Sequence, residues 1–101
     1  MAAPGDNLEF LESRYYAAKI SNAPALANEI VEHLKSWPHS GTAVCGGVRQ
    51  MRFQSRRQYY SVLFLRKGQR MALLNIFEVP EREEALEEYL REVRKTFCGQ
   101  R

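Results

Sequence analysis

Apolar residues recur with two different periods along the chain, and the change of period separates helical from extended segments. In the N-terminal part, Leu8, Leu11, Tyr15 and Ala18 follow one another at intervals of three to four residues. This spacing keeps side chains on one face of a helix. We therefore expect a short amphipathic helix over 8–18, with a strand over Leu8–Leu11 as the alternative.

A second helix is expected from Pro24 to about Trp37. Proline suits the first turn of a helix, because its missing N–H would have no partner there in any case. The residues Ser21–Ala23 break the preceding pattern, and Pro38 stops the second helix. The two helices together predict an N-terminal helical hairpin. Residues 1–6, MAAPGD, are expected to be a flexible leader before a single domain over 7–98.

Past a Gly-containing loop at 39–47, the pattern becomes that of strands. We expect strands over 48–53, 59–65 and 71–77. The second of these segments is rich in aromatic and β-branched side chains, which is typical of strands. Residues 66–69 are expected to form a hairpin turn in which Gly68 supplies a positive φ. The last of the three segments is almost entirely apolar, so we expect a central strand covered on both faces. The three strands predict an antiparallel meander in a three- to four-stranded sheet.

A closing helix is expected from Pro80 to Phe97, with Gly99 ending it. Acidic side chains gather in its first turns and basic ones in its last, and both signs are favourable against the helix dipole. The order of helix, helix, three strands and helix predicts an α+β fold. The length of 101 residues suits one domain.

The distribution of charged residues along the chain is more informative than the net charge. The formal net charge is only +3, but no Asp or Glu occurs between Glu32 and Glu78. If the fold gathers this segment on one face, that face is strongly positive and suits nucleic acid or an acidic protein partner. A plain solvated surface is the third interpretation. The cations of the segment are Lys35, Arg49, Arg52, Arg56, Arg57, Arg66, Lys67 and Arg70.

The remaining composition argues for a protein without resident cofactors. No familiar catalytic motif occurs, and His33 and His39 have poor spacing for a metal, so we expect neither metal nor cofactor. Cys45 and Cys98 lie far apart and fit no metal motif, and we expect two reduced thiols. No apolar run is long enough to cross a membrane and no signal-peptide core is present, so we expect a soluble, cytoplasmic protein.

The basic and aromatic stretch over 49–70 is the candidate site. Because strand side chains alternate between faces, an inward Met51 and Phe53 would turn Arg52 outward. Arginine forks bind phosphates, and tyrosine rings stack on unpaired bases. The residues considered for catalysis are Arg52, Arg56, Tyr59 and Tyr60, and those considered for nucleic-acid binding are Arg49, Arg57, Arg66, Lys67 and Arg70.

These segments also resemble a known family. The stretches Gly47–Arg52, Tyr59–Phe64, Lys67–Arg70 and Leu73–Phe77, followed by a closing helix, resemble the RelE/ParE superfamily of toxins from type II toxin–antitoxin modules. The HigB-like branch is the most similar. The resemblance covers about residues 8–97, with its specific motifs in about 30 of them.

The resemblance implies a RelE-like fold and a toxin that cuts mRNA on the ribosome without metal. It also implies a cognate antitoxin as partner, beside RNA or the ribosome. By the motifs, Arg52 matches an arginine of the family and Tyr59 a tyrosine. Tyr60 stands where the family has arginine, and Glu78 where it has a basic residue, although Arg56 or Arg57 could supply the charge. A ParE-like gyrase inhibitor and a non-catalytic binding protein with the same fold are the alternatives.

Overall fold

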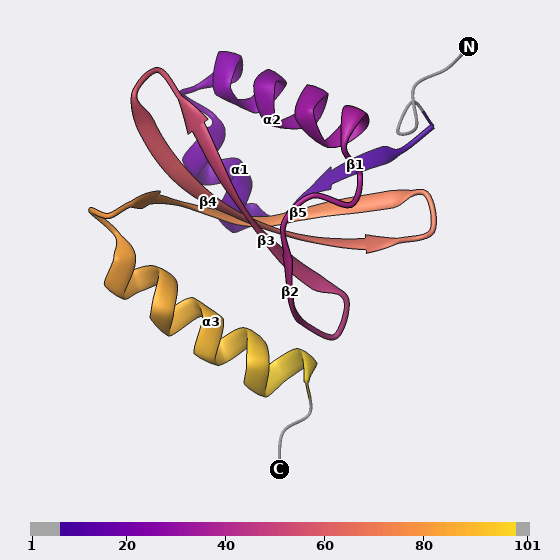
Figure 1. Ribbon diagram of the computed structural model, residues 1–101, viewed down its shortest axis with the longest axis vertical. Helices are drawn as coiled ribbons and strands as arrows, with labels where there is room; N and C mark the ends of the chain where they lie inside the picture. Colours follow the sequence, from indigo (N-terminus) through magenta and orange to yellow (C-terminus); the bar gives the residue numbers. More distant parts are fainter. Residues whose placement is uncertain (1–6, 99–101) are drawn as a thin grey trace.

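The protein is a five-stranded sheet with helices on both faces, as the computed structural model shows for residues 7–98 (Figure 1). The strands lie in the order β1-β5-β4-β3-β2. β1 runs parallel to β5, and the other neighbours are antiparallel. The α+β class is therefore confirmed, but the sheet is mixed and larger than predicted. The elements are β1 (Glu9–Glu12), α1 (Arg14–Ile20), α2 (Pro24–Ser36), β2 (Thr42–Cys45), β3 (Val48–Ser55), β4 (Gln58–Lys67), β5 (Arg70–Val79) and α3 (Glu83–Phe97).

The N-terminal segment differs from the predicted helix over 8–18. Its first half is the strand β1, which agrees with the alternative prediction, and α1 begins only at Arg14. Ser13 marks the change, because its Oγ accepts a hydrogen bond from the N–H of Tyr16 at 3.1 Å and also donates to the carbonyl of Leu74. This cap ends the strand and starts the helix. The predicted N-terminal helical hairpin is accordingly not confirmed, and the leader at 1–6 lies outside the described residues.

The antiparallel meander is confirmed as β3, β4 and β5, each extending a little beyond its predicted ends. The structure adds β2 within the segment expected to be a loop, paired with β3 across a turn at Gly46–Gly47. Pro80 lies in a turn before α3, which starts at Glu83 and not at Pro80 as predicted.

Two apolar clusters lie on opposite faces of the sheet. One includes Tyr16, Ile30 and Leu34 of α1 and α2, and the other includes Leu86 and Leu90 of α3. β5 contributes to both clusters, as its continuous apolar run predicts. The β4–β5 pairing has an irregularity between Leu63 and Phe64, which changes the alternation of side chains along β5. As a result, Met71, Leu73 and Ile76 lie on one face of the sheet, and Phe77 and Val79 lie on the other.

The expectation of two free thiols is contradicted. Cys45 at the end of β2 and Cys98 after α3 form a disulfide, with their Cα atoms 5.5 Å apart. The 53 residues between them hid this contact, because only the fold brings the end of α3 to the β2–β3 turn (Figure 1). Within residues 7–98, no helix is long and apolar enough to span a bilayer.

Candidate nucleic-acid interface

The tip of the β3–β4 hairpin holds two arginines in an unusual backbone conformation. Ser55 pairs with Gln58, which leaves a two-residue turn of Arg56 and Arg57 with φ of 51° and 71°. Residues with a Cβ resist this left-handed region, at a cost of roughly 1–2 kcal/mol each. The β2–β3 turn takes similar φ values of 55° and 86° with Gly46 and Gly47, which carry no such cost.

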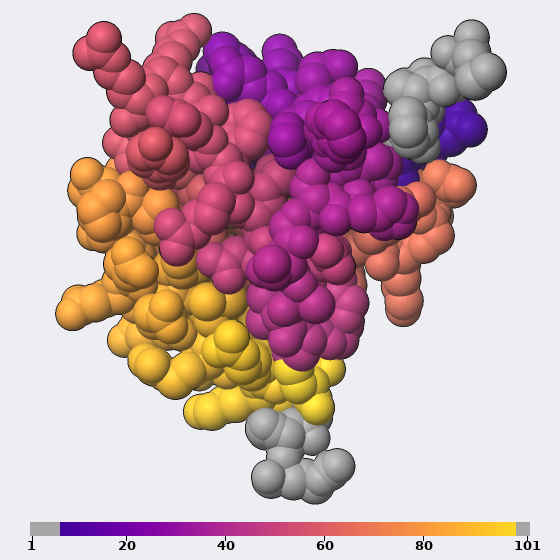
Figure 2. Space-filling model, viewed as in Figure 1, coloured from indigo at the N-terminus to yellow at the C-terminus, as the bar shows by residue number. Residues whose placement is uncertain are grey.

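The residues that flank this tip are anchored to neighbouring elements. Ser55 Oγ donates to Glu29 Oε1 of α2 at 2.6 Å. Gln58 Nε2 donates to the carbonyl of Val79 and to Glu81 Oε1, each at 3.3 Å. Arg56 and Arg57 are exposed, and among residues 7–98 neither has a carboxylate within 4.0 Å. The hairpin end protrudes from the surface at the upper left of Figure 2, so both guanidinium groups are free to meet a ligand.

Arg52 and Tyr59 lie on one face of the sheet close to this tip. Arg52 is opposite Ser61 and Tyr59 is opposite Gln54, so the two are diagonal neighbours on the same face, about 7–8 Å apart. Arg52 is exposed and Tyr59 is 51% exposed. Arg52 and Tyr59 thus share one face next to the tip that carries Arg56 and Arg57, while Arg56 also lines a pocket with Tyr60 on the other face. We call Arg52, Arg56, Arg57 and Tyr59 the hairpin surface.

Tyr60 lies on the other face of the sheet, where it packs against the α1–α2 cluster. It pairs with Phe53 on one side and Glu78 on the other. Burial raises the pKa of its hydroxyl, and the nearby carboxylates of Glu78 and Glu29 raise it further. Tyr60 therefore points away from Arg52 and Tyr59, because consecutive strand residues point to opposite faces, and it lines a pocket with Arg56 instead.

The other arginines considered for binding are held elsewhere. Arg49 donates to the carbonyls of Ser40 at 3.0 Å and Gly41 at 2.6 Å, so it fastens the loop before β2. Arg66 donates to the carbonyl of Gly68 at 3.0 Å, and Arg70 forms an ion pair with Glu9 at 3.3 Å.

The acid-free stretch of sequence does not form one positive face. The β4–β5 turn, with Lys67 and Arg70, and the β3–β4 turn lie at opposite ends of β4 (Figure 1). With ten residues in β4, these ends are about 30 Å apart. Carboxylates from outside the stretch also join its surface, namely Glu9 beside Arg70 and Glu29 beside Ser55.

A groove lies beside the hairpin tip, on the α1–α2 face, and no pattern in the sequence predicted it. Two adjoining pockets, of about 570 and 420 Å³, share Asn22, Ala23, Leu26 and Tyr60. One reaches Lys19 and Arg82, and the other reaches Arg56. Lys19 and Arg82 are 63 positions apart in the chain and belong to no motif, so no local signal pointed to them.

Nothing among the described residues brings three or more His, Cys, Asp or Glu side chains together as a metal site. No protein-family model matches the chain, and no curated protein matches it.

Proposed function

We propose that this protein binds single-stranded RNA through the hairpin surface and acts as a toxin of a type II toxin–antitoxin module, a metal-independent mRNA endoribonuclease. The observation that carries the proposal is the Arg56–Arg57 turn. Strained backbone persists where the surrounding structure holds it, and it gathers at functional sites. Two arginines stand where Asn or Gly would be less strained, which supports selection for their charge.

The chemistry of the hairpin surface suits a phosphodiester. Arg52 and Arg56 would bind phosphate oxygens and stabilise the charge that grows on a pentavalent phosphorus. The exposed ring of Tyr59 would stack on an unpaired base, and its hydroxyl would orient the 2′-hydroxyl for attack. Tyr60 takes no part in this arrangement. A cognate antitoxin would block the protein by covering the same four side chains.

A non-catalytic RNA-binding protein is the second candidate, and the position of Tyr60 favours it. With Tyr60 on the far face, Tyr59 is the one titratable side chain on the hairpin surface besides the arginines. The hairpin surface would then bind RNA and leave it intact.

RNA binding is tested by fluorescence anisotropy with a short single-stranded RNA at several salt concentrations. We expect Arg56→Ala/Arg57→Ala to weaken binding and to lower the salt slope by roughly 0.7 for each lost phosphate contact. Arg66→Ala, at the other end of β4, is the matched control and should behave as wild type. If both variants lose the same RNA affinity, binding depends on the overall positive charge of the protein and not on the hairpin surface.

Cleavage is tested by inducing the chain in bacteria and mapping mRNA 5′ ends. New ends in translated mRNA that vanish in Arg52→Ala support the toxin. RNA binding without new ends supports the non-catalytic protein. Absence of RNA binding, together with intact transcripts, refutes both, and loss of DNA supercoiling would identify a ParE-like gyrase inhibitor instead.

A further inference from the structure

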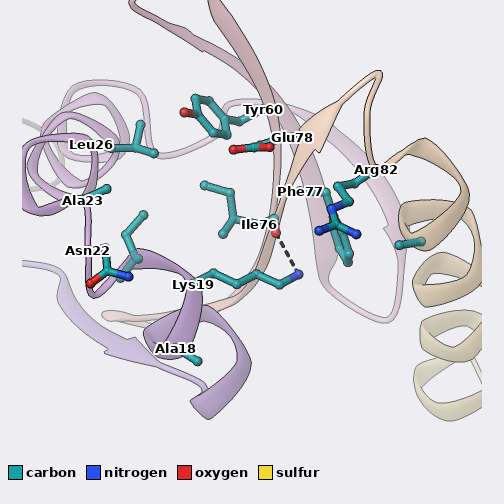
Figure 3. Close-up of a pocket in the computed structure, with 12 residues that line it drawn as sticks. Ala18, Lys19, Asn22, Ala23, Leu26, Tyr60, Ile76, Phe77, Glu78 and Arg82 are labelled. Carbon is teal, nitrogen blue, oxygen red and sulfur yellow. Dashed lines mark hydrogen bonds between the residues drawn. The ribbon is translucent and has the colours of Figure 1, made fainter.

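The larger pocket of the groove lies between α1, β5 and the start of α3, and its lining includes none of the four hairpin-surface residues. It has a volume of about 570 Å³, within the range of roughly 300–1,000 Å³ usual for small-molecule sites. Figure 3 shows the Lys19 side chain reaching toward Arg82, with Phe77 beside Arg82 and Ile76 in the middle of the pocket. Glu78 lies next to Tyr60, and Leu26 lies on the side away from Arg82.

Lys19 is fixed in this pocket by its neighbours. Its Nζ donates to Asn75 Oδ1 at 2.8 Å and to the carbonyl of Ile76 at 3.0 Å, and it lies 3.8 Å from the centre of the Phe77 ring. Asn75 is only 4% exposed and is itself held, since its Oδ1 also accepts from the N–H of Ile76. These two acceptors and the Phe77 ring hold the ammonium group in place, and its positive charge is available to an anion in the pocket.

Arg82 brings a second positive charge to the same corner. It is near enough for its charge to disfavour the protonated form of Lys19 and lower the pKa of that lysine, in addition to the larger effect of burial. Among residues 7–98, neither cation has a carboxylate within 4.0 Å. Two cations that repel each other and lack an acidic partner are stabilised by an anion bound between them.

The rest of the pocket indicates the size and shape of that anion. Away from the two cations, the walls are the apolar side chains of Ala23, Leu26 and Ile76 and the ring of Tyr60. A flat ring can pack on such a surface. Asn22 and Glu78, on the same lining, offer a donor and acceptors to ring amino groups or ribose hydroxyls.

We propose that this pocket binds a nucleoside monophosphate, with the phosphate between Lys19 and Arg82 and the base against Tyr60, Leu26 and Ile76. The proposal does not depend on RNA binding by the hairpin surface, because the two cations approach the pocket from α1 and from the turn before α3.

The test is a titration with AMP, inorganic phosphate and adenosine, followed by calorimetry and by amide shifts in ¹H–¹⁵N NMR spectra. We expect AMP to bind most tightly and to shift the amides of residues 18–26 and 76–85. Arg82→Ala should weaken AMP binding by about tenfold or more, the loss expected for one charge-assisted hydrogen bond. Arg82 is exposed, so its removal should leave the fold intact, and the same spectra verify this.

Arg66→Ala is the control and should bind AMP as wild type does. Equal affinity of AMP and adenosine would overturn the phosphate site, and equal affinity of AMP and inorganic phosphate would overturn the contact with the base. The whole proposal fails if millimolar AMP shifts no amide of the pocket, or if Arg82→Ala and Arg66→Ala bind it equally. None of these outcomes bears on the RNA test of the hairpin surface.

Discussion

Replacing the strained turn by Arg56→Asn/Arg57→Gly should stabilise the protein while it abolishes the proposed function of the hairpin. The native φ values are 51° and 71°. Glycine at position 57 removes a strain of roughly 1–2 kcal/mol and loses about 0.5–1 kcal/mol through the greater freedom of the unfolded chain. Asparagine tolerates the left-handed region better than arginine and recovers part of the strain at position 56.

The net gain is therefore about 1 kcal/mol. For a domain of this size it corresponds to a rise in Tm of about 4–8 °C. Thermal unfolding followed by circular dichroism measures the shift, and the anisotropy assay on the same sample should show weakened RNA binding. A gain in stability with a loss of binding is what a strained functional turn predicts.

Gly68 provides the matched control for backbone strain. Its φ is +60°, and a Cβ built there meets no atom within 4 Å. Gly68→Ala therefore introduces strain without a steric clash, and we expect a loss of about 1 kcal/mol. If Gly68→Ala lowers the Tm but the double substitution at 56 and 57 leaves it unchanged, then the two arginines are not strained and the argument for their selection is wrong.

Three further predictions concern the rest of the fold. Reduction of the Cys45–Cys98 disulfide, which links residues 53 positions apart, should cost about 2–4 kcal/mol in urea unfolding, and a reductant should have no effect on Cys45→Ser/Cys98→Ser. Asn75→Ala should destabilise the protein by about 1–3 kcal/mol, because the buried N–H of Ile76 and the ammonium of Lys19 each lose an acceptor; an unchanged urea midpoint would contradict this role. Burial and, to a smaller extent, the charge of Arg82 lower the pKa of Lys19 from 10.5. AMP affinity should therefore fall as the pH rises through that lowered pKa, because the ammonium group loses its charge there. Glu78 is the carboxylate on the same pocket lining. Calorimetry across alkaline pH should show this fall in wild type but not in Lys19→Arg, and a parallel fall in both would contradict the assignment.

The sequence alone determined the elements whose signals are local. The meander over β3, β4 and β5 follows from runs of apolar and aromatic residues with turn residues between them. Alternation along β4 also places Tyr59 and Tyr60 on different faces of the sheet, because a strand has a period of two. The outward position of Arg52 follows from the same period, with Met51 2% exposed on the opposite face.

The first strand shows why a local pattern can mislead. Residues 9–12 satisfy a helical spacing as well as an extended one, and their own propensity does not decide between the two. Pairing with β5 does, because β1 supplies hydrogen bonds to an edge that would otherwise lack them. That edge belongs to a segment about 60 positions later in the chain, so the choice is tertiary.

Only the tertiary structure decided which charged and reactive side chains meet. It joined Cys45 to Cys98, placed Glu9 beside Arg70, separated the two basic hairpin tips, and brought Lys19 toward Arg82. Propensity and periodicity act over a few residues, whereas these contacts depend on how the helices pack across the sheet. The sequence therefore determined where the three strands of the meander and the basic residues lie along the chain, and the packing of α1 and α3 on opposite faces of the sheet determined which of them share a surface.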